Sequence, residues 1–111
     1  MEYHIYDCVN LSADEIINYL IEIYPELQDR RARAGVYIGA TGNIADRLYR
    51  HNAKDNLLFC AKVANRRVAA RFEKIALESG FEIGDVKHGG NGTNSYSIFV
   101  YAYEIDKYTI E

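Results

Sequence analysis

A chain of 111 residues with 49% apolar residues has room for one globular domain over residues 1–111 with a modest hydrophobic core, which excludes an intrinsically disordered chain. The formal net charge of -3 at pH 7 does not exclude a nucleic acid as partner, because the charges are unevenly distributed along the chain. The sequence contains neither an apolar stretch long enough to span a membrane nor the basic-then-apolar layout of a signal peptide, so we expect a soluble, cytoplasmic protein.

The first part of the chain predicts a strand, a helix and a second strand. Residues 3–9 (YHIYDCV) are aromatic and β-branched, as is typical of a strand. Ser12 and Glu15 form the S-x-x-E capping box of a helix over 13–24, whose apolar residues recur at helical spacing. Residues 35–39 (GVYIG) then predict a second strand.

The rest of the chain continues this alternation and ends in two consecutive strands. Helices are predicted over 43–52 and 66–79, with a buried strand over 56–63 between them. The segments 81–87 and 95–105 predict two strands joined by a turn-rich connection, as in a hairpin. The order β-α-β-α-β-α-β-β predicts an α+β fold with a small mixed or antiparallel sheet, flanking helices and a C-terminal hairpin.

Positive charge is concentrated in the middle of the chain. Residues 1–29 contain seven acidic residues and no Lys or Arg, whereas residues 30–71 contain ten Lys or Arg and two acidic residues. Such a segment suits a polyanionic partner, and the alternative is that its cations pair with the acidic flanks in the folded chain. The candidate nucleic-acid-binding residues are Arg30, Arg31, Arg33, Arg50, Arg66 and Arg67.

The two cysteines predict buried thiols rather than disulfide or metal chemistry. Cys8 and Cys60 lie in apolar runs, as buried free thiols of a reducing compartment do. The histidines and cysteines also lack the spacing of zinc ligands.

Residues 35–52 (GVYIGATGNIADRLYRHN) carry the most specific pattern of the sequence. An apolar strand meets Gly39, passes a T-G-N turn and continues as a helix that carries Arg47 and His51. This stretch resembles the second motif of the GIY-YIG nuclease family, with Tyr37 as the tyrosine of the Y-I-G triplet.

Two further segments resemble the same family. His-Ile-Tyr at residues 4–6 resembles the first motif, with Tyr6 as its tyrosine. Residues 57–80 resemble the downstream strand and helix, which places the acidic residue of that helix at Glu73. The resemblance implies a GIY-YIG-like sheet in which Tyr6 and Tyr37 lie side by side on paired strands.

The activity implied by the resemblance is that of a divalent-metal-dependent endonuclease that hydrolyses phosphodiester bonds of nucleic acid. Tyr6 and Tyr37 would position or deprotonate the attacking water, and Arg47 would hold the scissile phosphate. His51 would relay a proton or bind a flanking phosphate. Glu73 would be the single protein carboxylate on a Mg²⁺ or Mn²⁺ ion. These side chains are expected to line one concave surface.

A catalytically inactive binding protein on the same scaffold is the alternative function, in which the basic face holds a nucleotide, a nucleic acid or a protein partner. The expected partner in either case is nucleic acid, DNA in preference to RNA, or a nucleotide, as for small proteins that phages and mobile elements encode. Apolar residues on both faces of 95–105 predict either a doubly covered strand or an exposed edge. Pairing of such an edge with a second copy predicts a homodimer.

Overall fold

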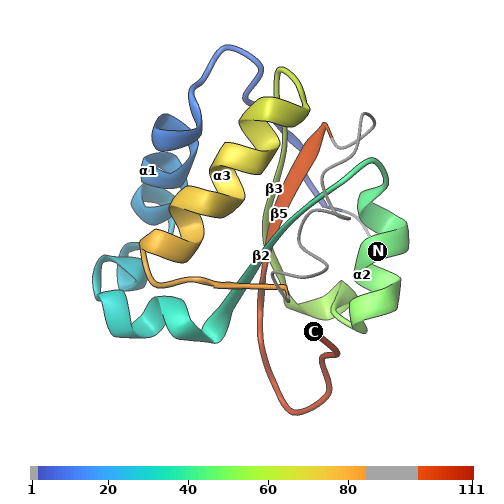
Figure 1. The fold of residues 1–111 in the computed structure, drawn as a ribbon. Helices are drawn as coiled ribbons and strands as arrows, with labels where there is room; N and C mark the ends of the chain where they lie inside the picture. The colour runs from blue at the N-terminus through green and yellow to red at the C-terminus, as the bar shows by residue number, and fades with distance from the viewer. Residues whose placement is uncertain (1–2, 85–97) are drawn as a thin grey trace.

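The chain forms a five-stranded mixed sheet that carries helices on both of its faces (Figure 1). The structure, a computed structural model, describes residues 3–84 and 98–111. In chain order the elements are β1 (Tyr6–Asp7), α1 (Ala13–Ile23), a 3-10 helix (Pro25–Gln28), a second 3-10 helix (Arg30–Gly35), β2 (Val36–Thr41), α2 (Ile44–His51), a third 3-10 helix (Lys54–Asn56), β3 (Leu57–Lys62), α3 (Arg66–Glu78), β4 (Glu82–Ile83) and β5 (Phe99–Glu104).

The C-terminal strand β5 lies at the centre of the sheet. The strand order is β1-β3-β5-β2-β4, with β5 antiparallel to both β3 and β2. The short strands β1 and β4 are parallel to β3 and β2 and form the two edges. The expected α+β fold with a mixed sheet is confirmed.

The predicted C-terminal hairpin is wrong, because β2 lies between β4 and β5. Its turn-rich connection, residues 85–97, lies outside the described residues. The same topology removes the reason for expecting a homodimer through β5. Both edges of β5 are hydrogen-bonded within the chain, so its apolar faces belong to a doubly covered central strand.

Alternating side chains divide the core into two layers. On β5, Val100 and Ala102 face α1 and α3, whereas Tyr101 and Tyr103 face α2. On β2, Ile38 faces α1 and α3 in the same way. The helices α1 and α3 lie side by side on one face of the sheet, and α2 covers the other (Figure 1).

Side-chain caps start the helices near the predicted positions. Ser12 Oγ accepts from the Glu15 amide at 3.2 Å, and Glu15 Oε1 accepts from the Ser12 amide at 2.9 Å, which confirms the capping box. Asn43 and Asn65 cap α2 and α3, each accepting a backbone N–H at 3.0 Å. Asn52, with φ 52°, ends α2 in the left-handed conformation.

Both cysteines are free and buried, as the sequence predicts. Burial raises the pKa of the Cys60 thiol to about 11, so this thiol is protonated at neutral pH. Over residues 3–84 and 98–111, none of the helices combines the length and apolar character needed to cross a bilayer.

Candidate functional site

A cluster of aromatic rings covers the α2 side of the sheet. Tyr37 and Tyr103 occupy directly opposite positions on the antiparallel strands β2 and β5, and their stacked rings have centroids 5.0 Å apart. Tyr101, two residues before Tyr103, stacks on it at 6.4 Å. The imidazole of His51 packs against Tyr37 with a centroid distance of 4.8 Å. Three tyrosines from two paired strands thus surround one histidine from α2.

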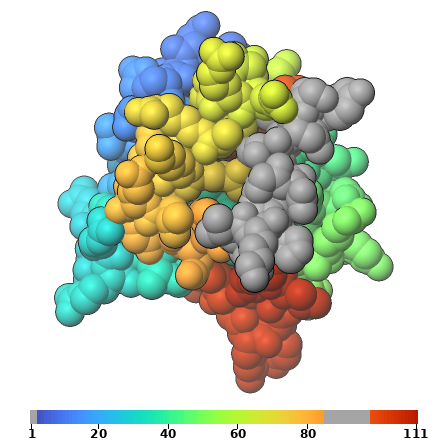
Figure 2. All heavy atoms as spheres, in the orientation of Figure 1, coloured from blue at the N-terminus to red at the C-terminus, as the bar shows by residue number. Residues whose placement is uncertain are grey.

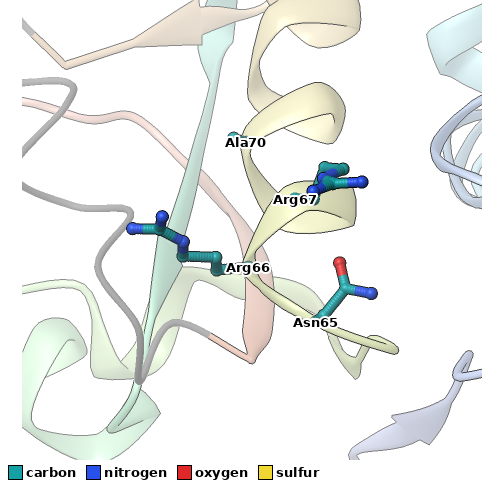
Figure 3. A pocket seen from close by; sticks show the side chains of 4 residues that line it. All are labelled: Asn65, Arg66, Arg67 and Ala70. Atoms are coloured by element: carbon teal, nitrogen blue, oxygen red, sulfur yellow. The ribbon is translucent and has the colours of Figure 1, made fainter.

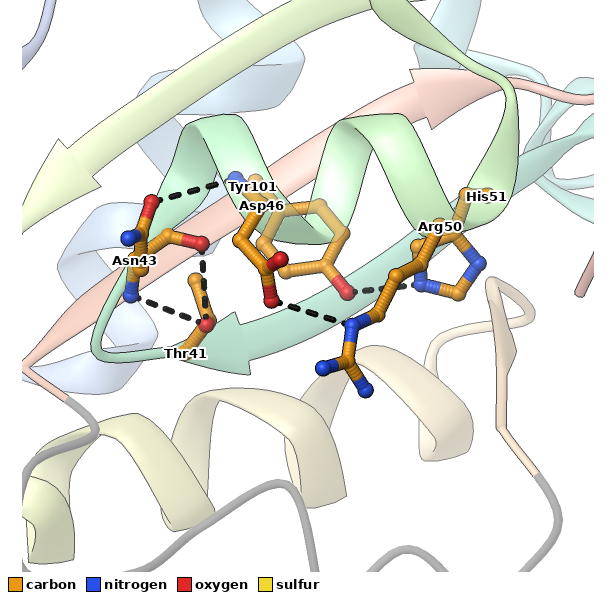
Figure 4. A network of polar contacts seen from close by, with 6 residues as sticks. All are labelled: Thr41, Asn43, Asp46, Arg50, His51 and Tyr101. Atoms are coloured by element: carbon orange, nitrogen blue, oxygen red, sulfur yellow. Dashed lines mark hydrogen bonds and ion pairs between the residues drawn. The ribbon is translucent and has the colours of Figure 1, made fainter.

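The strand-to-helix turn after β2 orients the first turn of α2 (Figure 4). The Thr41 hydroxyl accepts from the Asn43 amide at 3.0 Å, and the Asn43 side chain accepts from the Asp46 amide. One turn later, Asp46 pairs with Arg50 at 3.0 Å. These contacts position the helix face that carries Leu48 and His51 toward the sheet.

The hydroxyl of Tyr101 reaches across β2 because Gly39 has no side chain. A Cβ atom on Gly39 would lie 2.3 Å from the Tyr101 hydroxyl oxygen, which is shorter than any allowed contact. His51 Nε2 lies 3.0 Å from that hydroxyl (Figure 4). His51 Nδ1 lies 2.7 Å from the carbonyl of Ile110. The glycine of the Y-I-G triplet therefore gives a tyrosine access to the histidine.

Arg47 and Glu73 bring opposite charges to this cluster from two different helices. Burial raises the pKa of the Glu73 carboxyl to about 7, and the Arg47 guanidinium acts against this shift. After burial, the Glu73 carboxylate is the largest influence that raises the pKa of Tyr37, and Arg47 lowers it. The same two charges act on Tyr101. Arg47 and Glu73 are thus close enough to influence the pKa of both Tyr37 and Tyr101.

The helix α3 and the ring of Tyr37 lie on opposite faces of the sheet. Within the described residues, β4 covers the outer edge of β2 only at Tyr37 and Ile38. Both α2 and α3 border the face of the molecule seen in Figure 2, with the C-terminal segment next to them. The Glu73 carboxylate on α3 nevertheless raises the pKa of Tyr37 on the other face.

The expectation that Tyr6 and Tyr37 lie on paired strands is wrong. β1 pairs with β3 and is separated from β2 by β3 and β5. Tyr6 packs on the α1 side, stacked on Phe59 at 5.2 Å and in edge contact with Tyr19 at 5.4 Å. The residue across from Tyr37 is Tyr103, so Tyr6 does not share a surface with the other predicted residues.

Tyr101 and Tyr103 were missed by motif matching, although the sequence carried a signal for them. A strand that is apolar on both faces belongs at the centre of a sheet, where it has two neighbours. Residues 95–105 are apolar on both faces over a long run. The strand segment around Tyr6, residues 3–9, is shorter. The long C-terminal strand was therefore the better candidate for the partner of β2.

Most of the predicted nucleic-acid-binding arginines have partners within the chain. Arg30 and Arg33 donate to the carbonyls of Glu78 and Ser79 at 2.8 and 3.0 Å, which satisfies the C-terminus of α3. Arg31 pairs with Asp29 at 3.3 Å. Of these three residues, Arg31 pairs with an acidic flank as the alternative expects, whereas Arg30 and Arg33 are bound by backbone carbonyls.

Arg66 and Arg67 occupy a different environment at the start of α3. Both side chains are exposed and, with Asn65 and Ala70, line a cavity of about 630 Å³ (Figure 3). Figure 3 shows the two guanidinium groups pointing to different sides of the helix. Their positive charges add to the positive end of the α3 dipole.

The donor set fits a divalent cation that is held by a single carboxylate. Among the described residues, no group of three or more His, Cys, Asp or Glu side chains is arranged to bind a metal. Glu73 is half-buried, and desolvation raises its pKa, so a neighbouring cation would stabilise its ionised form. Mg²⁺ accepts one carboxylate together with water and substrate oxygens, and Mn²⁺ suits the same oxygen ligands.

Comparison with protein-family models, with curated proteins and with solved structures gives no match for this chain. The resemblance to the GIY-YIG nuclease family therefore stays a prediction from the residues of the sequence.

Proposed function

We propose that this chain is a divalent-metal-dependent endonuclease that hydrolyses phosphodiester bonds of nucleic acid. The observation that carries the proposal is the stacked cross-strand pair of Tyr37 and Tyr103, because the Tyr37 phenol of this pair is influenced by the charges of Arg47 and Glu73. Tyr103 takes the role that the family resemblance implies for Tyr6.

The hydroxyl of Tyr103 supports this assignment. It is buried and makes no hydrogen bond of normal geometry within the described residues, and the nearby Glu111 carboxylate raises its pKa both by its charge and as a hydrogen-bond acceptor. A buried hydroxyl without a full hydrogen bond costs about 1–3 kcal/mol, so this position favours a further polar partner. A water or phosphate oxygen bound beside Tyr37 would satisfy it.

Arg47 and Glu73 have complementary tasks in this proposal. The half-buried Arg47 guanidinium presents planar donors to two oxygens of the scissile phosphate, and partial burial limits the screening of its charge by solvent. Glu73 would hold Mg²⁺ or Mn²⁺, which when bound supplies positive charge to the phosphoryl oxygens. Arg66 and Arg67, at the start of the same helix as Glu73, would contact the backbone of the nucleic acid at their cavity.

The test is a cleavage assay with plasmid, single-stranded DNA and RNA, in Mg²⁺, Mn²⁺ and EDTA. We expect cleavage only with a metal ion and its loss in Glu73→Gln, which keeps the shape of the side chain but removes the charge. Glu78→Gln is the matched control, because it makes the same change at an exposed position of the same helix. Cleavage that survives in Glu73→Gln would mean that the metal is bound elsewhere.

A catalytically inactive binding protein on the same scaffold is the second candidate. The observation that favours it is the burial of Tyr101 and Tyr103, which are 1% and 0% exposed and pack as core residues. In that case the wild type cleaves none of the substrates, and Glu73→Gln binds nucleic acid equally well or more tightly because a negative charge is lost.

A further inference from the structure

The C-terminal segment (residues 105–111) is attached to the end of α2. The Ile110 amide donates to the His51 carbonyl at 2.7 Å, and the Ile110 carbonyl lies 2.7 Å from His51 Nδ1. Asn52 adds a hydrogen bond to the Tyr108 carbonyl at 3.0 Å. The peptide of Ile110 is thereby fixed relative to the imidazole ring.

These contacts decide which nitrogen of His51 carries the proton. A carbonyl oxygen only accepts hydrogen bonds, so Nδ1 must be the donor toward Ile110. His51 is 7% exposed, and burial lowers its pKa, so the ring is neutral at neutral pH. A neutral ring with hydrogen on Nδ1 has a free lone pair on Nε2, which therefore accepts from the Tyr101 hydroxyl.

We propose that the C-terminal segment is a positioning device that holds His51 in the Nδ1–H tautomer and makes Nε2 the acceptor of the proton that leaves through Tyr101. This inference rests on the proposed nuclease function and assigns His51 to proton relay rather than to phosphate binding. Both ring nitrogens already have internal partners, so neither is free for a phosphate oxygen.

In the proposed step, the proton of the attacking water reaches His51 by way of Tyr101. As the oxygen of the attacking water bonds to phosphorus, its proton passes to the Tyr101 oxygen, and the Tyr101 proton passes to Nε2 of His51. The bond from phosphorus to the leaving oxygen breaks on the opposite side, where that oxygen takes a proton from solvent, and the imidazolium afterwards loses its proton to solvent through Tyr101. The Tyr101 hydroxyl occupies the space above Gly39, and the charges of Arg47 and Glu73 influence its pKa.

Several neighbouring groups influence the protonation of this histidine. Three phenols face the ring from the paired strands, and the charged groups are Arg47 on its own helix and Glu111 on the C-terminal segment. Arg47 disfavours the imidazolium and Glu111 favours it. Loss of Ile110 and Glu111 would therefore remove both the tautomer constraint and a carboxylate that stabilises the charged ring.

The direct test is nitrogen NMR of the full chain with isotope-labelled histidine, in which His51→Gln identifies the signals of His51. We expect a protonated Nδ1 and an unprotonated Nε2 at neutral pH. Tyr101→Phe should keep this tautomer and lower the cleavage rate by about 10²-fold or more. A chain that ends at Thr109 should lose the preference for Nδ1–H, and its pH–rate profile should shift.

Tyr108→Ala is the matched control, because only the backbone of this exposed residue contacts Asn52. It should leave both the tautomer and the pH–rate profile unchanged. An Nε2–H tautomer in the wild type, in a chain that cleaves, overturns the inference and leaves the nuclease proposal standing. If the wild type has the Nδ1–H tautomer but never cleaves, the nuclease proposal fails, and the proton relay fails with it.

Discussion

Gly39 shows how a single residue connects the strand motif to the histidine. Because a methyl group at this position would lie 2.3 Å from the Tyr101 hydroxyl, Gly39→Ala must displace the tyrosine from His51. We expect a loss of about 1–3 kcal/mol in the free energy of unfolding, as is usual for overpacking. Urea denaturation measures it.

Gly35→Ala serves as the control for this change. A Cβ atom on Gly35 would meet no atom within 4 Å, so the substitution should leave the unfolding free energy nearly unchanged. Equal stabilities of the two variants would show that Tyr101 does not occupy the space above Gly39.

Residues that share one local pattern could be grouped from the sequence, whereas residues from distant strands could not. Arg47 and His51 are four residues apart, so helical spacing alone puts them on one side of α2. The partner of Tyr37 is 66 positions away along the chain at Tyr103, and no local motif encodes that pairing. Tyr6 is predicted as the partner from its triplet His-Ile-Tyr, but this local triplet does not determine which strand lies beside β2.

At the scale of elements, the two ends of α3 depend on different segments of the chain. Its N-terminus is capped by Asn65, next to it in sequence, and its C-terminus by arginines from the 3-10 helix Arg30–Gly35. Local capping can be predicted from the sequence, as for Asn65, but long-range capping cannot. The sequence therefore predicts nucleic-acid contacts for arginines of this 3-10 helix whose partners in the structure are backbone carbonyls.

Substitution of Arg33 tests whether the arginines of this 3-10 helix stabilise the fold by capping α3. Its side chain is partly buried, donates to the carbonyls of Leu27 and Ser79, and stacks over the ring of Phe81 at 5.8 Å. Arg33→Ala should lower the free energy of unfolding by about 1–3 kcal/mol, because two acceptors lose their charged donor. Arg31→Ala is the control: its side chain is 92% exposed, so the change should be small. If Arg31→Ala is the more destabilising of the two, Arg33 does not have this stabilising role.

At the scale of the whole molecule, the basic middle segment does not form one continuous binding surface. Internal partners occupy several of its arginines, whereas Arg66 and Arg67 line an accessible cavity. Replacing both residues with Ala should weaken binding to a DNA duplex and reduce its dependence on salt, because phosphate contacts release counterions. Fluorescence anisotropy over a range of salt concentrations measures this.

The control for this experiment is Arg31→Ala, which removes an exposed charge that is paired with Asp29. Wild-type affinity that does not change between low and moderate salt would mean that the acidic flanks neutralise the basic segment. An equal loss for Arg31→Ala would mean that net charge, rather than the cavity, governs binding.

The strand order makes the most direct test of the whole account possible, because it replaces Tyr6 with Tyr103 as the partner of Tyr37. The measurement is the metal-dependent cleavage rate of Tyr103→Phe and Tyr6→Phe, which remove the same hydroxyl from opposite faces of the sheet. The account predicts that Tyr103→Phe loses about 10²-fold or more in rate while Tyr6→Phe cleaves as the wild type does. A wild type without activity, or a loss confined to Tyr6→Phe, would contradict it.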